Sequence, residues 1–326
     1  MLKPFNTIYF DIVNSCNARC PYCLTGCEKQ STVKMISPEK FEAVLLKLRH
    51  EGVLEEKCVI SLYNWGEPFL HPKLDELVEI TNKLDIKYAL STNGSIPHRI
   101  SADFVKNLDH IIFSMCGFSQ ESYSRIHGTN FESVQKNIVK LVTDCRNSGF
   151  SGTFSISFHV YKFNLDEMPL CQKFADAHGI QFKPYYAILN HWWDLEKFAK
   201  GELDVSRVHE ISEELIGLNE ITAIMKKSPR PYSCSQHDLL IITENADVMA
   251  CCQLPKERAE FSCGNILTDT IDSILRKKRS VPVCKECTEL GLAYYINHSL
   301  ITPPEHKKSL TQRTFSLKRK IRKILQ

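Results

Sequence analysis

Three cysteines stand close together near the start of the chain, in the stretch SCNARCPYC, at Cys16, Cys20 and Cys23. Three thiolates with the spacing CxxxCxxC can ligate three irons of one iron–sulfur cube and leave the fourth iron open to a small molecule. Two other interpretations stay open. The cysteines can be buried thiols, because free cysteine is among the most buried residue types. Alternatively, Cys20 and Cys23 can share a zinc ion with the later C-x-x-C pair, Cys284 and Cys287.

A second group of six cysteines lies between residues 231 and 290. Four thiolates suit a structural zinc ion or an iron–sulfur cluster that has no open iron. Cys251 and Cys252 are adjacent, and adjacent residues of a strand point to opposite faces of a sheet. We therefore expect only one of these two thiols to reach a shared metal centre, and the sequence leaves open which one.

Strand-like and helix-like segments alternate six times before residue 190. The expected strands are residues 7–13, 58–65, 87–94, 110–117, 153–161 and 180–189. This alternation predicts a parallel sheet with right-handed crossovers. Six units fall short of a closed eight-stranded barrel, so we expect an α/β fold, an open partial (β/α)6 TIM-like barrel. The first three cysteines directly follow the first strand, at the end of such a barrel where active sites form.

The chain divides by pattern into four parts. These are the partial barrel (1–190), a helical linker (191–230), a small domain with the second cysteine group (231–300) and a basic tail (301–326). In the tail, Leu317, Ile321, Ile324 and Leu325 share one helical face. The tail therefore either contacts an anionic membrane surface peripherally or is a solvated end.

The composition is that of a globular protein, with 43% apolar and 24% charged residues. The N-terminus lacks the features of a signal peptide, and no run of eighteen apolar residues is present. We therefore expect a cytoplasmic protein, in which the fourteen cysteines do not form a disulfide framework. The net charge is +3, but residues 306–326 carry eight Lys and Arg residues and no acid. The rest of the chain is mildly acidic, which argues against a nucleic-acid-binding protein.

The stretch CNARCPYC resembles the signature of the radical S-adenosylmethionine (radical SAM) superfamily, in which an aromatic residue, here Tyr22, precedes the last cysteine. Three later stretches resemble further motifs of these enzymes, each at the end of an expected strand: NWGEP (64–68), STNG (91–94) and FSMCGFSQESYSRIHG (113–128). Trp65 replaces a glycine of the family motif, and Cys116 stands where aspartate is common. The resemblance covers about residues 5–190.

This resemblance implies that Cys16, Cys20 and Cys23 ligate a [4Fe-4S] cluster whose open iron binds S-adenosylmethionine (SAM). Reductive cleavage of SAM then gives a 5′-deoxyadenosyl radical that takes a hydrogen atom from the substrate. The cofactors supply this chemistry and the protein positions them. Glu67 is expected to hold the ammonium group of SAM by a charge-assisted hydrogen bond. The residues implied to contact the cofactor are Tyr22, Trp65, Gly66, Glu67, Thr92, Asn93 and Ser114.

The second cysteine group resembles the auxiliary-cluster domain of the SPASM and twitch subfamilies. The ligands implied there are Cys234, Cys251, Cys284 and Cys287, with Cys252 as the rival of Cys251. No cysteine follows Cys287, so the resemblance implies one auxiliary [4Fe-4S] cluster and two clusters in total. Ala246 replaces a turn glycine of the family pattern, and we expect Cys263 to be a core residue. A zinc-stapled hairpin is the alternative.

Four protein ligands would leave the auxiliary cluster no open iron, so its expected role is electron transfer or structural support. The resemblance implies that such a cluster can accept the electron left on a substrate radical. We therefore expect a radical SAM oxidoreductase of the dehydrogenase type that acts on a sugar, aminosugar or aminocyclitol alcohol. The layout is most similar to the twitch-type 2-deoxy-scyllo-inosamine dehydrogenase. The implied electron donor is a flavodoxin or ferredoxin. A peptide or protein maturase, a radical epimerase, and a zinc-stapled protein that binds RNA or membrane are the alternatives.

The sequence identifies catalytic residues only weakly. Cys116 is the candidate thiol for an epimerase, and Lys183 and Tyr185 are further candidates for catalytic residues. The candidates for the general base lie near the ends of the fifth and sixth expected strands and are His159, Lys162, Lys183, Tyr185, Tyr186 and His191.

Overall fold

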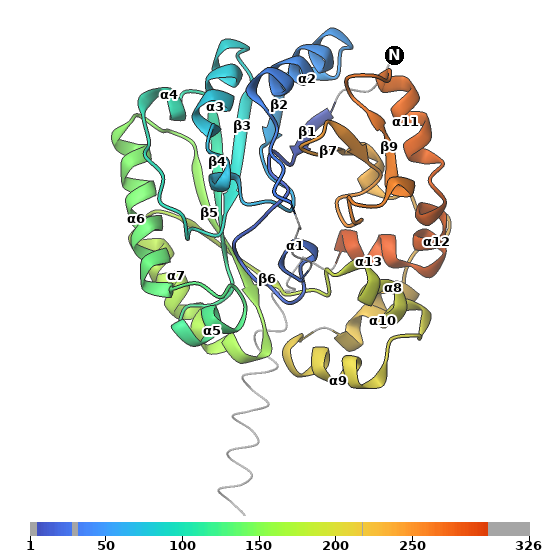
Figure 1. The fold of residues 1–326 in the computed structure, drawn as a ribbon. Coiled ribbons are helices and arrows are strands. Elements are labelled where there is room, and N and C mark those ends of the chain that lie inside the picture. Colours follow the sequence, from blue (N-terminus) through green and yellow to red (C-terminus); the bar gives the residue numbers. More distant parts are fainter. Residues whose placement is uncertain (1–4, 28–31, 217, 299–326) are drawn as a thin grey trace, which may run out of the picture.

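The structure, a computed structural model, describes residues 5–27, 32–216 and 218–298. Its centre is a nine-stranded sheet in the order β6-β5-β4-β3-β2-β1-β7-β8-β9 (Figure 1). The strands are β1 (Phe5–Phe10), β2 (Leu54–Ser61), β3 (Lys87–Thr92), β4 (Leu108–Met115), β5 (Thr153–Val160), β6 (Gln181–Tyr186), β7 (Leu240–Ile242), β8 (Asp247–Met249) and β9 (Ser262–Asn265).

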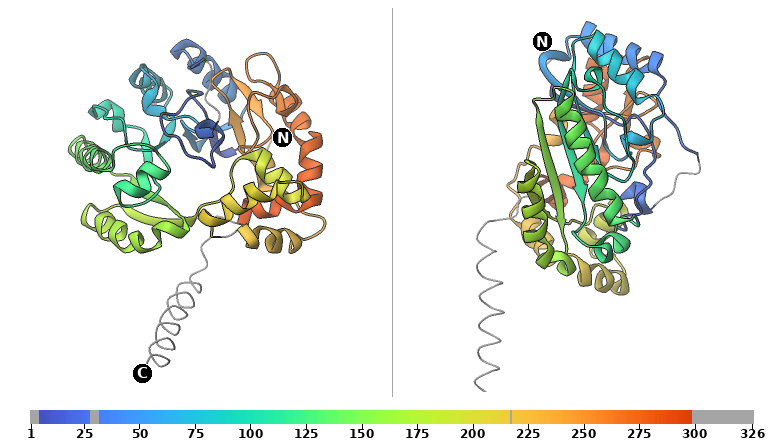
Figure 2. Two further views of the ribbon diagram at one scale, coloured as in Figure 1. Left: turned by 60° about the horizontal axis from the view of Figure 1, so that its bottom comes forward. Right: turned by 90° about the vertical axis from the view of Figure 1, so that its left-hand side faces the viewer.

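The first six strands are all parallel, and helices connect them along the outer side of the curved sheet (Figure 2). These helices are α2 (Pro38–His50), α3 (Leu74–Lys83), α4 (Ala102–Val105), α5 (Gln120–Arg125), α6 (Phe131–Asn147) and α7 (Met168–Ala177). The expected α/β fold with an open, partial (β/α)6 barrel is confirmed.

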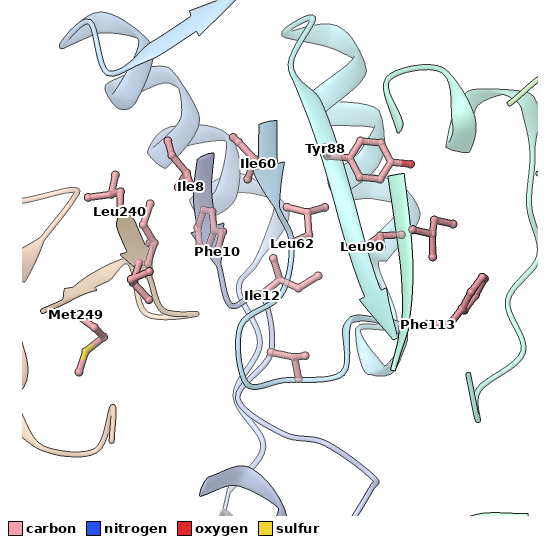
Figure 3. Packing of buried hydrophobic residues seen from close by; sticks show 14 of the residues in the cluster. Ile8, Phe10, Ile12, Ile60, Leu62, Tyr88, Leu90, Phe113, Leu240 and Met249 are labelled. Atoms are coloured by element: carbon pink, nitrogen blue, oxygen red, sulfur yellow. The ribbon is translucent and has the colours of Figure 1, made fainter. Parts of the chain in front are cut away.

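Alternation along β1 decides which side chains face the helices. Ile8, Phe10 and Ile12 are fully buried on the helix side of the sheet (Figure 3), where the ring of Phe10 packs 5.2 Å from that of Phe41 in α2. Successive side chains of a strand point to opposite faces. Tyr9, which lies between Ile8 and Phe10, therefore faces the concave side of the sheet.

The region with the second cysteine group continues the sheet of the barrel. β7 pairs in parallel with β1, with Ile8 opposite Leu240, and β8 and β9 follow as antiparallel strands. The turn between β7 and β8 forms although alanine replaces the family glycine, since Ala246 adopts a left-handed backbone with φ of 70°. The strands of the C-terminal region therefore extend the sheet that carries the first cysteine loop.

The remaining helices are α8 (Trp192–Lys200), α9 (Val205–Glu214), α10 (Leu218–Lys226), α11 (Ile271–Arg279), α12 (Pro282–Leu290) and α13 (Leu292–His298). The expected boundaries at residues 190 and 230 fall between elements, and the division into domains stays a prediction. The basic tail, residues 301–326, lies outside the described residues. None of the helices in the described ranges is long and apolar enough to cross a membrane.

Candidate functional site

The loop after β1 brings Cys16, Cys20 and Cys23 together just before the short helix α1 (Leu24–Cys27). Burial raises the pKa of all three thiols, that of Cys16 to about 12, and Cys23 adds to this effect at Cys16 and Cys20. The loop is tight, since a Cβ atom on Gly26 would lie 2.4 Å from the carbonyl oxygen of Cys20. Three neighbouring, half-buried thiols ionise when a metal centre takes up their charge, so this donor set fits an iron–sulfur cluster.

The carboxylate of Asp11, the residue that follows β1, holds the loop after β2 in place. Asp11 is 2% exposed, and its Oδ1 accepts hydrogen bonds from the backbone N–H groups of Gly66 at 2.8 Å and Trp65 at 3.2 Å. A Cβ atom on residue 66 would lie 2.0 Å from the carbonyl oxygen of Val13. Only glycine allows this approach of the two backbones, so the NWGEP loop rests directly on the segment that leads to Cys16.

Glu67 joins the loops after β2 and β3. Its carboxylate accepts hydrogen bonds from the backbone N–H groups of Asn93 at 2.8 Å and Phe69 at 3.2 Å. The side chain is 3% exposed, and burial raises its pKa to about 7. Both oxygens therefore bind the backbone, which gives Glu67 a positioning role. Its expected contact with the ammonium group of SAM stays a prediction.

The turn after β3 reaches the first cysteine. The Asn93 side-chain amide lies 2.9 Å from Asn17 Oδ1 and 3.7 Å from the sulfur of Cys16. The hydroxyl of Thr92 accepts the backbone N–H of Gly94 at 3.1 Å. Through Glu67 and Asn93, three of the motifs that resemble radical SAM enzymes form one hydrogen-bonded unit.

Tyr22, the aromatic residue of the cysteine motif, is held by the helical linker. Its hydroxyl donates to Glu214 Oε2 in α9 at 2.6 Å, and Arg125 Nε donates to Glu214 Oε1 at the same distance. Glu214 lies 192 residues from Tyr22 in the sequence. No local pattern marks it, and sequence analysis missed its role.

A buried ion-pair cluster joins the C-terminal region to the NWGEP loop. Lys256 Nζ lies 3.0 Å from Asp11 Oδ2 and 3.4 Å from Glu244 Oε2. The side chains of Lys256, Asp11 and Glu244 are 10%, 2% and 4% exposed. Because Asp11 also holds Gly66, this cluster connects the loop after Cys251 with the loop expected to bind SAM. The only sequence signal for it is the acid within the apolar stretch TIYFDIV.

Replacing Lys256 by methionine is expected to lower the free energy of unfolding by about 3 kcal/mol, because two buried carboxylates lose their cation. Urea unfolding followed by circular dichroism under anaerobic conditions measures the change. Lys285→Met, at a side chain that is 83% exposed, is the control and should alter stability by less than about 0.5 kcal/mol. Equal stabilities of Lys256→Met and the unaltered protein would contradict the assigned role.

The four cysteines expected to hold an auxiliary cluster line one pocket. Cys234 precedes β7, Cys251 follows β8, and Cys284 and Cys287 lie in the first turns of α12. The pocket has about 410 Å³ of space, part of it open to solvent. Most of its other wall residues are apolar and include Trp192, Ala250, Leu254, Val283, Ala293 and Ile296. Four thiols that converge on an apolar pocket fit a cluster with four protein ligands.

Cys252 is not among the residues that line this pocket. Its sulfur lies 3.2 Å from Gln236 Oε1. On the barrel side, the pKa of Tyr9 is raised by burial and by the charge of Cys252. The arrangement supports Cys251 as the ligand. Cys263 is 2% exposed within β9, as expected for a core residue.

No three His, Cys, Asp or Glu side chains of the described residues lie close enough together to bind a single metal ion. The cysteines of a cube bind different iron atoms, so they stand farther apart than the ligands of one ion. Both cysteine groups are therefore compatible with clusters.

Cys116, the epimerase candidate, is fully buried. Its sulfur lies 3.8 Å from the carbonyl oxygen of Ser122, and burial raises its pKa to about 12. A thiol that returns a hydrogen atom must touch the substrate. Its burial favours a core role at the end of β4, and a role of Cys116 in an epimerase stays an untested prediction.

Polar side chains occupy the concave face near the ends of the last strands. Ser157 and His159 alternate with the buried Phe158 in β5, and the register places Lys183 beside Ser157 and Tyr185 beside His159. The sheet therefore brings together the weak candidates Lys183 and Tyr185. Ser114 of β4 lies on the same face, since it is paired with Ser157.

The candidates for the general base differ in their surroundings. Lys162 donates to the carbonyl oxygen of Ser212. His191 lies 3.5 Å from the carboxylate of Asp194. Tyr186 follows Tyr185 in β6 and so faces the helix side. His159 lies 3.4 Å from the Ser157 hydroxyl, and burial lowers its pKa to about 4, so its ring is uncharged at neutral pH.

Residues 11–174 match the family model described as the Radical SAM superfamily. The chain belongs to this superfamily. Membership implies a [4Fe-4S] cluster and SAM as cofactors, and the three cysteines of the signature lie within the matched residues. This radical SAM chain is also 25% identical over 280 residues to the antilisterial bacteriocin subtilosin biosynthesis protein AlbA of Bacillus subtilis (strain 168). The match covers 81% of this chain and 58% of AlbA.

The structure of a known protein shares the fold. SuiB of Streptococcus suis bound to its precursor peptide SuiA aligns over 84% of this radical SAM chain and 65% of its own, with 15% identity and a TM-score of 0.57. BtrN in complex with AdoMet and 2-DOIA aligns over 90% of both chains with 18% identity and a TM-score of 0.47. The expected membership of the radical SAM superfamily is confirmed, and the SPASM/twitch subfamily stays a prediction. The chain spans about half the length of the curated relatives that it matches.

Proposed function

We propose that this radical SAM enzyme oxidises a small polar alcohol, of the sugar, aminosugar or aminocyclitol class, by two electrons. One observation carries the proposal: the four cysteines suited to a second cluster line one pocket, in a region whose strands extend the sheet bearing the first cysteine loop. A second cluster without an open iron would take up an electron. A redox-neutral rearrangement would have no use for such an acceptor.

The proposed reaction balances in atoms and electrons. One electron from the reduced first cluster would cleave SAM to methionine and a 5′-deoxyadenosyl radical. The carbinol carbon of the substrate gives one hydrogen atom to this radical, which becomes 5′-deoxyadenosine. The substrate hydroxyl then gives its proton to a base, and the remaining electron passes to the auxiliary cluster. The product is a ketone.

His159 is the base that fits this step best among the six candidates. Its ring is uncharged at neutral pH, so a ring nitrogen can accept a hydrogen bond from the substrate hydroxyl, although the burial that lowers its pKa to about 4 also makes it a weak base. Ser157, Lys183 and Tyr185 surround it on the concave face. Hydroxyl and ammonium groups of this kind suit a substrate rich in hydroxyl groups.

A peptide maturase is the second candidate. The similarity to AlbA, a bacteriocin biosynthesis protein, extends over 81% of this chain and favours a peptide substrate. The match to the radical SAM superfamily speaks against a zinc-stapled RNA- or membrane-binding protein. We further propose a flavodoxin or ferredoxin as the electron donor.

The test supplies the reduced, two-cluster protein with SAM and a panel of aminocyclitols and sugars deuterated at the carbinol carbons. We expect deuterium in 5′-deoxyadenosine and one ketone formed per SAM consumed. The parallel arm supplies any short precursor peptide encoded beside the gene. Loss of two hydrogens from that peptide, with no ketone from the panel, would favour the maturase. Stoichiometric turnover of either substrate without net oxidation would overturn the oxidoreductase.

A further inference from the structure

Helix α11 places a lysine where its pattern calls for an apolar residue. Ile271, Ile274 and Lys278 follow the spacing of one buried helix face, and each is at most 1% exposed. The neighbouring Lys277 and Arg279 are exposed. The helix thus has basic residues available to water on both sides of a lysine that is wholly buried.

The buried ammonium group has no acidic partner. Lys278 Nζ donates to the carbonyl oxygen of Leu239, and no carboxylate of the described residues lies within ion-pair distance of it. A charge buried without an opposite charge costs several kcal/mol or neutralises, as the order of magnitude for isolated buried ions shows. The charged form of Lys278 is therefore unfavourable as long as only neutral groups lie next to its ammonium group.

The carbonyl that Lys278 binds belongs to Leu239, which follows the pocket residues Gln236 and His237 and leads into β7. The charge of Lys278 also acts to lower the pKa of the pocket thiols Cys234, Cys251 and Cys284. It acts in the same direction on the pKa of Cys252 and of Cys263 in β9. When thiols bind a metal centre they do so as thiolates. Thiolates at the four candidate ligand positions would then supply the opposite charge that the ammonium group of Lys278 lacks.

We propose that Lys278 is the internal counter-ion of the auxiliary iron–sulfur cluster and raises its reduction potential. The inference rests on the proposed function, because it requires the cluster that Cys234, Cys251, Cys284 and Cys287 are proposed to hold. Cluster potentials depend on net charge, hydrogen bonding and exposure to solvent. A buried cation stabilises the reduced, more negative state of the cluster more than the oxidised state. Lys278 therefore makes the cluster a better acceptor for the electron left on the substrate.

The experiment uses the full chain with Cys16, Cys20 and Cys23 replaced by alanine, so that only the auxiliary cluster is present. Lys278→Gln removes the charge and keeps a donor for the Leu239 carbonyl. Lys277→Gln removes the same charge from an exposed position one residue away and is the matched control. A redox titration monitored by electron paramagnetic resonance measures the potential of each variant.

We expect Lys278→Gln to shift the potential to a more negative value and Lys277→Gln to leave it unchanged, because water screens an exposed charge. No shift, or equal shifts in the two variants, would overturn the inference. If Lys278→Gln loses its iron, Lys278→Arg decides. Iron retained with arginine supports a need for the charge, and iron lost in both variants overturns it.

The iron content of the parent chain separates this inference from the proposed function. About four irons per chain in the triple cysteine variant support the auxiliary cluster before Lys278 is changed. No iron in that parent would overturn the proposed function, and the inference about Lys278 would fall with it. An unchanged potential in an iron-loaded Lys278→Gln protein would overturn the inference alone.

Discussion

Replacing Gly66 by alanine is expected to reduce SAM cleavage at least about 100-fold. The new Cβ atom would lie 2.0 Å from the carbonyl oxygen of Val13, so the two backbones must separate. The separation would also disturb the hydrogen bond from the Gly66 N–H to Asp11. A displacement of about 1 Å in a positioning element can cost about 100-fold in rate. Formation of 5′-deoxyadenosine in the presence of dithionite measures the effect.

The control for this variant is Gly201→Ala. Gly201 ends α8 with φ of 74°, and a Cβ atom there would meet nothing within 4 Å. The control therefore carries backbone strain of about 1 kcal/mol without a steric clash, and cleavage should proceed at the unaltered rate. Full cleavage by Gly66→Ala would show that the close approach of the two loops is not needed for SAM chemistry.

Replacing Cys251 by alanine is expected to remove the auxiliary cluster, whereas replacing its neighbour Cys252 should leave the cluster in place. Cys251 lines the pocket together with the other three candidate ligands, and Cys252 does not. Iron should fall from about eight to about four atoms per chain in Cys251→Ala and stay at about eight in Cys252→Ala. Iron and acid-labile sulfide analysis of anaerobically reconstituted protein measures both.

The two variants differ by one position and remove the same chemical group, so each controls for the general effect of losing a thiol. We also expect Cys251→Ala to cleave SAM while failing to oxidise substrate, because the first cluster is intact. The reverse result, with iron lost in Cys252→Ala and retained in Cys251→Ala, would exchange the assignments of the two residues.

The barrel and the first cysteine loop could be predicted because their signals are local. Strands such as Thr153–Val160 alternate buried and polar residues, and the motifs that resemble radical SAM enzymes follow the strands directly. The boundaries were less accurate. β1 begins at Phe5 and ends at Phe10, where residues 7–13 were expected, and β6 ends at Tyr186 rather than at residue 189.

Contacts between distant segments could not be predicted. Lys256 lies 245 residues from Asp11, and Glu214 lies 192 residues from Tyr22, so neither pair leaves a pattern in a window of sequence. The three-residue strand Leu240–Ile242 is too short to predict that it pairs with β1. The sequence therefore carried no sign that the strands of the C-terminal region extend the sheet of the barrel, and the division into domains stays a prediction.

The central claim is that this chain holds two iron–sulfur clusters, the second of which accepts an electron from the substrate. The most direct test counts iron and acid-labile sulfide in the anaerobically reconstituted chain and in its Cys16/Cys20/Cys23→Ala variant. The account predicts about eight irons per chain, falling to about four in the variant. About four irons that fall to none would contradict it, because the C-terminal cysteines would then hold no cluster.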